Sequence, residues 1–196
     1  MNYDDIFKFY ESKLDTEKTV KSLGWGSIEG QKIRFKKLIE RMGFNESVLD
    51  VGCGYGDFFH YLKCYLLLHE NNYCGIDIRE DAITEARKRY SKGHFHIGDI
   101  EIINNKYDWI VASGIFCHPN ENNHQYILKN IQKFYSLCNK GVSVNFLSQY
   151  SHNKNPEMYY ADPLEIIKLV SEHITHKYIL MTDYLPNDFT IILTRI

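Results

Sequence analysis

The sequence has no long hydrophobic run, no closely spaced cysteine pair and no basic leader. No apolar stretch approaches the ~20 residues that a bilayer-spanning helix needs, and the first residues lack the apolar segment of a signal peptide. The five cysteines are odd in number, and no two are spaced as in C-x-x-C. We therefore expect no disulfide framework and no metal site, and we expect a cytoplasmic protein without a membrane partner.

The chain also has little net charge. A formal charge of −2 over 196 residues gives no electrostatic basis for binding nucleic acid. The composition, 44% hydrophobic and 24% charged, is ordinary for a globular protein, and the length suits one domain with a sizeable core. We expect a single domain over 1–196, whose oligomeric state the sequence does not indicate.

One stretch, Val48 to Phe58, organises the rest of the chain. Its apolar start, Val48–Val51, is typical of a buried strand, and the glycines at 52, 54 and 56 indicate a tight turn. Glycine permits positive φ and lets a ligand approach the backbone closely. Apolar residues after Gly56 then begin a helix, whose first N–H groups lack intrahelical partners. This strand, loop and helix are predicted to bind a small molecule.

Strands and helices alternate after this stretch. The apolar runs predict five strands, and helices are expected over about 57–68, 80–90 and 123–137. This alternation indicates a parallel sheet with helices on both faces. The expected strands are Val48–Val51, Tyr73–Ile78, Phe95–Ile97, Trp109–Ala112 and Val142–Leu147.

Both ends of the chain depart from this alternation. After a helix over 163–172, two strands at Lys177–Met181 and Phe189–Leu193 lie too close in sequence for a helical crossover, so an antiparallel hairpin is expected. At the other end, amphipathic patterns predict helices over 3–20 and 31–42, with Gly43 as the C-terminal stop of the second. We expect residues 1–43 to form a helical cap on a core of residues 44–196.

Acidic residues end the second and third predicted strands. In an open parallel sheet, ligands bind beyond the carboxyl ends of the strands. Asp77 follows Gly56 by 21 residues, a spacing at which an acid can accept hydrogen bonds from both hydroxyls of a ribose. Asp99 ends the next strand and Ser113 the one after it. These positions predict a nucleoside-type ligand.

The series VLDVGCGYGDF, YCGIDI, HIGDI and YDWIVASGIF, with the closing hairpin, resembles class I S-adenosylmethionine (SAM)-dependent methyltransferases over nearly the whole chain. The likeness is to small-molecule enzymes of bacterial surface-glycan and natural-product type. It implies an α/β, Rossmann-like sheet of seven strands in the order 3-2-1-4-5-7-6, with strand 7 antiparallel and helices on both faces. It also implies SAM as cofactor and S-adenosylhomocysteine (SAH) as product.

The resemblance assigns roles to the residues at the strand ends. It implies that the glycine loop packs against the methionine and ribose part of SAM, that Asp77 binds the ribose and that Asp99 receives the adenine amine. An N-terminal pattern, roughly G-W-x-S-x-x-x-Q-x-x-R-F, resembles a subset of small-molecule methyltransferases. Its Arg34 could pair with the SAM carboxylate, and Trp25 could face the sulfonium. The cofactor-binding positions so implied are Trp25, Arg34, Asp50, Gly52, Gly54, Gly56, Asp77, Ile78, Asp99, Ile100 and Ser113.

The acceptor side of the reaction is less defined. An alcohol acceptor must lose a proton, and His118, shortly after the fourth strand, is the candidate base; His124, His152 and Asp183 are weaker alternatives. Four tyrosines in the loops after strands five and six are candidates for lining the acceptor pocket. They are Tyr150, Tyr159, Tyr160 and Tyr184.

Two further observations concern the class of acceptor. The sequence has neither the Pro-Cys pair of cytosine methyltransferases, since Phe116 precedes Cys117, nor the N/D-P-P-Y motif of base-amine methylation. The favoured function is O- or N-methylation of a small molecule, for example a sugar or surface-glycan precursor. Two alternatives stay open: a SAM-binding partner subunit without catalysis, and an NAD-dependent oxidoreductase, although Asp57 stands where G-x-G-x-x-G needs its third glycine.

Overall fold

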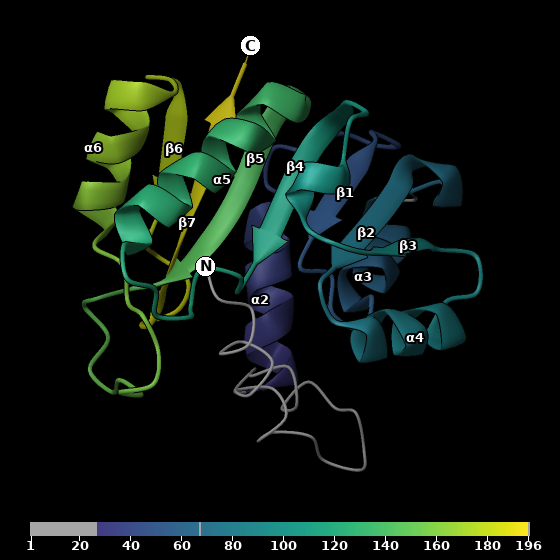
Figure 1. The fold of residues 1–196 in the computed structure, drawn as a ribbon, viewed down its shortest axis with the longest axis horizontal. Coiled ribbons are helices and arrows are strands. Elements are labelled where there is room, and N and C mark those ends of the chain that lie inside the picture. The colour runs from purple at the N-terminus through teal and green to yellow at the C-terminus, as the bar shows by residue number, and fades with distance from the viewer. Residues whose placement is uncertain (1–26, 67, 196) are drawn as a thin grey trace.

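The computed structural model describes residues 27–66 and 68–195, whose centre is a seven-stranded sheet (Figure 1). The strand order is β3-β2-β1-β4-β5-β7-β6, and β7 runs antiparallel to both of its neighbours. Both the predicted order and the predicted closing hairpin are confirmed. The strands are β1 (Val48–Val51), β2 (Tyr73–Asp77), β3 (His94–Ile97), β4 (Tyr107–Ser113), β5 (Cys138–Leu147), β6 (Tyr178–Met181) and β7 (Asp188–Thr194).

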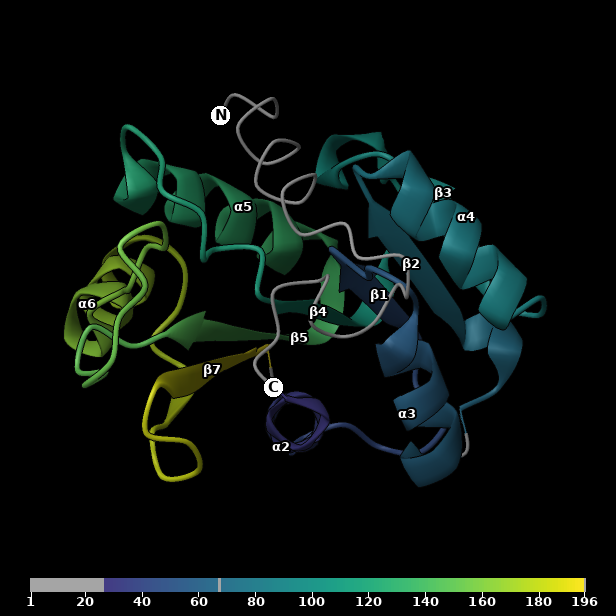
Figure 2. The same cartoon turned by 90° about the horizontal axis from the view of Figure 1, so that it is seen from below.

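Helices cover both faces of this sheet. The helices pack on the sheet through two apolar clusters, one on each face. Side chains of α2, α3 and α4 are buried in one cluster, and side chains of α5 and α6 in the other. Figure 2 shows α2 and α5 on opposite sides of β4 and β5. The helices are α2 (Ile28–Leu38), α3 (Asp57–Leu66), α4 (Glu80–Arg89), α5 (Asn123–Leu137) and α6 (Pro163–His173), with short 3-10 helices η2 (Glu70–Asn72) and η3 (Ile100–Ile102).

Local sequence explains where several helices begin. The Ser27 side chain accepts a hydrogen bond from Gly30 N and begins α2. The Asp162 side chain likewise accepts a hydrogen bond from Leu164 N at the start of α6, where Pro163 occupies the first helical turn. In α4, acidic residues stand in the first turn and basic residues in the last, as the helix dipole favours.

Two predicted boundaries are wrong. The second N-terminal helix was expected over 31–42 with Gly43 as its stop, but α2 runs from Ile28 to Leu38, because Ser27 caps it earlier and the chain turns at Ile39. Gly141 was expected to precede the fifth strand, yet it lies inside β5. A Cβ at Gly141 would stand 2.5 Å from the Trp109 ring, so this glycine allows close packing between β5 and β4.

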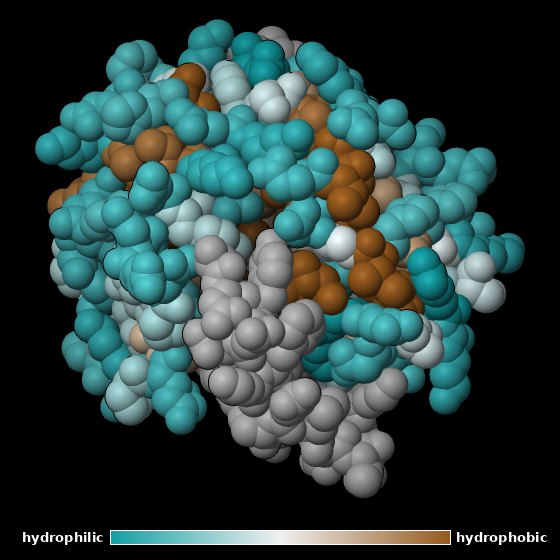
Figure 3. Space-filling view, in the orientation of Figure 1, coloured by the Kyte–Doolittle hydropathy of each residue, from teal (hydrophilic) through white to brown (hydrophobic). Residues whose placement is uncertain are grey.

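The face shown in Figure 3 is largely hydrophilic, with smaller apolar patches among its described residues. In residues 27–66 and 68–195, no helix combines the length and the apolar character needed to cross a membrane. The predicted helix over 3–20 and Trp25 lie outside the described residues.

Candidate active site

A cavity of about 330 Å³ lies along the carboxyl ends of the parallel strands. It extends from α2 past the loop after β1 and the ends of β2 and β3 to α5, β5 and the start of β7. Its size is that of a typical small-molecule site. The predicted site residues that line it are Arg34, Asp50, Gly52, Gly54, Asp77, Ile78, Asp99, Ile100, Ser113 and His118.

The glycine loop after β1 forms one wall of this cavity. Gly52, Gly54 and Gly56 have φ of 75°, 53° and 81°, a region that side chains rarely adopt. A Cβ at Gly52 would also lie 2.3 Å from Cγ2 of Ile115. Gly56 does not line the cavity; a Cβ there would lie 2.8 Å from the Phe95 ring. The loop therefore needs glycine both for backbone conformation and for packing.

Asp77 fixes the glycine loop to the end of β2. Its Oδ2 accepts a hydrogen bond from Gly54 N, and its Oδ1 accepts one from Arg79 N, both at 2.9 Å. Burial raises the pKa of Asp77, although these two backbone donors oppose the rise. Each oxygen can accept more than one hydrogen bond, so the carboxylate can hold the loop and also bind ligand hydroxyls.

Asp50 lies deeper, at 3% exposure in β1. Its Oδ2 accepts a 2.7 Å hydrogen bond from the Tyr73 hydroxyl. Burial raises the pKa of Asp50 to about 7, and the hydrogen bond from Tyr73 partly opposes this. The charge of Asp50, in the wall of the cavity, therefore changes with pH near neutrality.

The far end of the cavity lies between η3 and α5. Asp99 accepts a hydrogen bond from Glu101 N at 2.9 Å and so begins η3. Across from it, Lys129 pairs with Glu101 at 3.1 Å. Tyr126 from α5 also lines this end, and burial followed by the charge of Asp99 raises its pKa to about 12. A flat, partly polar group would find both apolar and hydrogen-bonding partners here.

The end of β4 is held by Asn145, a residue that sequence analysis missed. Its side chain, 2% exposed, accepts hydrogen bonds from Gly114 N at 3.2 Å and exchanges hydrogen bonds with the Ser113 hydroxyl. The only signal was a polar residue between two apolar neighbours, Val144 and Phe146. The next turn carries Cys117 and His118, and the buried His118 lines the cavity. Asn145 therefore sets the shape of the turn before His118.

A charged pair joins α2 to the start of β7. The guanidinium of Arg34 donates to both oxygens of Asp188, from Nε at 2.7 Å and from Nη2 at 2.8 Å. Asp188 is buried, lines the cavity and was not predicted. One turn earlier on α2, Gln31 donates to Asp57 at 3.3 Å, so α2 contacts both walls of the cavity.

The four candidate acceptor tyrosines lie outside the described lining of the cavity. Tyr150 is 60% exposed, the Tyr160 hydroxyl accepts from Asn155 N, and the Tyr184 hydroxyl bonds with that of Thr190. Tyr159 N donates to Cys117 O at 2.9 Å, which places the 150–160 loop beside the turn that carries His118. Their role in acceptor binding stays a prediction.

The weaker candidates for the base also lie apart from the cavity lining. His124 pairs with Glu165 at 3.1 Å, His152 is exposed, and Asp183 pairs with Lys37 at 3.5 Å. Of the histidines that sequence analysis considered, only His118 lies in the cavity. The described lining of the cavity thus combines a glycine cradle, strand-end carboxylates, two guanidinium groups and an imidazole, a set that fits a ligand with hydroxyls, an amine and a carboxylate, as SAM has.

Comparison with known proteins agrees with this geometry. A family model described as "Methyltransferase domain" matches residues 44–185. The "Putative methyltransferase Rv1506c" of Mycobacterium tuberculosis is 29% identical over 157 residues, which are 76% of this chain and 93% of that protein.

Solved structures show the same fold. Magnesium protoporphyrin IX methyltransferase from Synechocystis with bound SAH superposes with a TM-score of 0.66 at 14% identity, over 86% of this chain and 84% of that one. A SAM-dependent methyltransferase from Archaeoglobus fulgidus gives 0.67 at 17% identity, over 87% and 95%. This chain belongs to the methyltransferase domain family and is a SAM-dependent methyltransferase of class I.

Proposed function

We propose that this enzyme methylates an oxygen or nitrogen of a small molecule, such as a sugar or a surface-glycan precursor. The supporting observation is one cavity that joins the cofactor residues to His118. Its volume of about 330 Å³ suits a small ligand, and the chain has no excess of positive charge that would favour nucleic acid. Magnesium protoporphyrin IX methyltransferase, which shares the fold, is named for a small-molecule acceptor.

The cofactor positions follow from the strand ends. Asp77 binds the ribose hydroxyls, Asp99 and the neighbouring Ile100 take the adenine, and Ile78 packs beside it. Gly52 and Gly54 let the backbone approach the ligand. Asp50, Ser113, Gly56 and Trp25 complete the proposed cofactor set, Gly56 through its packing behind the loop.

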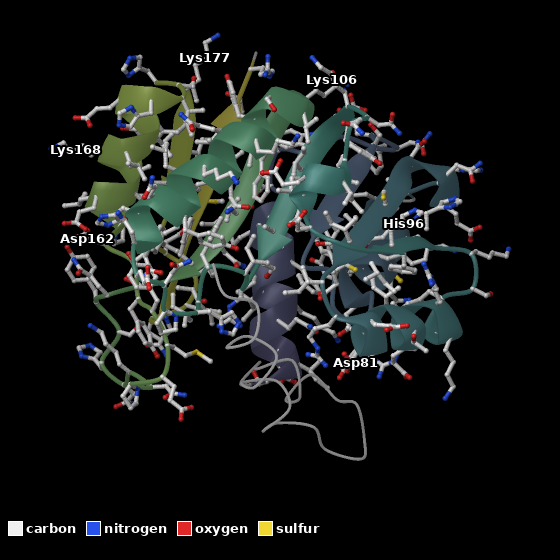
Figure 4. The ribbon with its side chains drawn as sticks, viewed as in Figure 1. Asp81, His96, Lys106, Asp162, Lys168 and Lys177 are labelled. Carbon is white, nitrogen blue, oxygen red and sulfur yellow. The ribbon has the colours of Figure 1, made fainter. Side chains whose placement is uncertain are left out.

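Arg34 is proposed to bind the cofactor's carboxylate. Each cationic side chain in the described lining has an acidic partner: Arg34 pairs with Asp188, Arg79 with Asp81, and Lys129 and Lys133 with Glu101. Asp81, labelled in Figure 4, lies in the first turn of α4. Its position, rather than the lack of an acidic partner, favours Arg34, which lies on α2 beyond the glycine loop.

His118 is proposed to take the proton from a hydroxyl acceptor. When bound, SAM supplies a methyl group already activated by its sulfonium, so the protein's main contribution is positioning and exclusion of water. His118 is buried in the cavity, after the turn that Asn145 holds. An amine acceptor that binds unprotonated would not need this base.

Calorimetric titration tests the cofactor, and an acceptor screen tests the reaction. We expect SAM and SAH to bind and NAD to give no heat; the reverse pattern would refute the cofactor assignment. A screen of sugars, nucleotide-sugars, phenols and amines should then release SAH with at least one small-molecule class. Transfer to RNA or protein with none to small molecules would overturn the acceptor proposal, and no transfer at all would favour a SAM-binding partner subunit.

A further inference from the structure

The pair of Arg34 and Asp188 has a geometry that lone surface ion pairs rarely have. Both oxygens of Asp188 are used, at 2.7 and 2.8 Å, and the two side chains are 13% and 3% exposed. A guanidinium and a carboxylate that meet in this parallel fashion fix each other's plane as well as each other's position. The orientation of Arg34 is therefore set by Asp188.

Asp188 is in turn held by the sheet. It begins β7, where it stands opposite Leu147 of β5, and the next pair of the antiparallel ladder is Phe189 with Phe146. Neighbouring backbone bonds add to this, since Ser148 N donates to Asn187 O at 2.9 Å. A carboxylate anchored in this way gives the flexible arginine side chain a rigid partner.

We propose that Asp188 is a positioning residue for the cofactor, because it aligns Arg34 to receive the carboxylate of the methionine part of SAM. This inference rests on the proposed role of Arg34. A guanidinium has five N–H donors in a planar fork, so one arginine can serve two carboxylates along different edges. An arginine side chain loses considerable rotamer entropy when it is fixed, and Asp188 fixes Arg34 before the ligand arrives.

Asp188 could instead act only through its charge, by neutralising Arg34. Charge and alignment predict opposite results for two substitutions. If neutralisation were its role, Asp188→Asn would expose the charge of Arg34 and strengthen binding of a carboxylate, while Asp188→Glu would behave as wild type. If alignment is its role, both substitutions weaken binding, since the amide of Asn offers N–H to a guanidinium and the longer Glu displaces it.

The experiment compares two ligands by calorimetry on the full chain. SAH carries the carboxylate, whereas 5′-methylthioadenosine lacks the whole amino-acid part. We expect Asp188→Asn and Asp188→Glu each to lower the affinity for SAH at least tenfold. The affinity for methylthioadenosine should stay within twofold of that of wild type. A merely structural defect would weaken both ligands alike.

Matched variants complete the design. Asp183→Asn removes an exposed carboxylate from the loop that leads to β7, and it should leave both ligands unchanged. Arg34→Met should weaken SAH alone, and adding Asp188→Asn to it should cause little further loss, because the two residues act as one unit. If Asp188→Asn does not fold, Asp188→Glu decides by the same comparison.

Three outcomes would overturn the inference: unchanged or tighter SAH binding in both Asp188 variants, equal loss of both ligands, or additive losses in the double variant. Failure of the proposed function looks different. In that case wild type would bind neither ligand, or Arg34→Met would bind SAH as well as wild type does.

Discussion

The hydroxyl of Tyr73 donates to Oδ2 of Asp50 across 2.7 Å and so joins β2 to β1 in the interior. Both side chains are buried, and burial raises the pKa of each. For Asp50 the result is a pKa of about 7, far above its ordinary value of 3.8. This acid therefore titrates near neutral pH in the folded chain and several units lower when unfolded.

Asp50→Asn should make stability less dependent on pH. Between pH values of about 4 and 7 the folded wild type holds a proton on Asp50 that the unfolded chain has lost, so stability falls as pH rises. Relative to that of the variant, the free energy of unfolding of wild type should fall by about 1.4 kcal/mol per pH unit in this window. Above the window it should fall no further. Urea unfolding at pH 5, 6, 7 and 8 measures the difference. Tyr73→Phe removes the hydrogen bond that lowers the pKa of Asp50, so the pH range over which stability falls should extend upward. If the stability of wild type and that of Asp50→Asn change equally with pH, the raised pKa of Asp50 is contradicted.

Gly52→Ala should distort the glycine loop. The φ of 75° and the 2.3 Å approach to Ile115 together oppose a side chain there, and strain of this kind costs roughly 1–3 kcal/mol. We expect a lower free energy of unfolding and loss of SAM binding, measured by urea titration and calorimetry. Adding Ile115→Ala should recover the part of the lost unfolding free energy that comes from contact with Ile115. It should not recover the part that comes from the positive φ at position 52. A single variant as stable and as tightly binding as wild type would be inconsistent with this loop geometry.

Asp77→Ala should lower the affinity for SAM at least tenfold. Each hydrogen bond to a carboxylate is worth roughly 1.5–3 kcal/mol, and the variant loses the ribose contacts together with the link to Gly54. Asp108→Ala is the matched control. Asp108 also accepts two hydrogen bonds, both from Ser47 before β1, but it does not line the cavity. Calorimetry should therefore show weaker SAM binding in the first variant only; similar losses in both would point to structural damage instead.

His118→Gln should lower turnover of a hydroxyl acceptor by roughly 10²–10⁴-fold, the usual contribution of a general base. SAM affinity should change less than twofold. Turnover is measured by SAH release with the acceptor found in the screen, and affinity by calorimetry. His124→Gln, which removes a half-exposed histidine on α5 outside the cavity, is the control and should leave both values unchanged. Full turnover in His118→Gln would exclude it as the base.

Features encoded by nearby residues were predictable from the sequence. The apolar runs of β1 and β4 and the glycines after β1 are local signals, and the strand order follows from the resemblance they carry. One boundary failed at a local cap, Ser27 at the start of α2, and another failed where a distant contact is involved. Gly141, for example, was expected to precede the fifth strand, but it lies inside β5, where it packs closely against Trp109.

The less predictable part of the site depends on contacts between residues far apart in the chain. Arg34 and Asp188 are separated by 154 positions, and Asp188 by itself resembles an ordinary acid at a strand border. Asn145 gave a weak signal as a polar residue among apolar neighbours, but its bond to Gly114 N required knowledge of the β4 and β5 register. Pairings of this kind follow from topology rather than from any motif.

The position of β7 has a consequence for biosynthesis. This strand comes last in the described sequence, yet it lies between β5 and β6, which have no direct pairing without it. During translation, β5 must therefore keep an open edge until residues 188–194 leave the ribosome. Because Asp188 is the first residue of that strand, the nascent chain cannot align Arg34 earlier, and we expect cofactor affinity to arise only after residues 188–194 have joined the sheet.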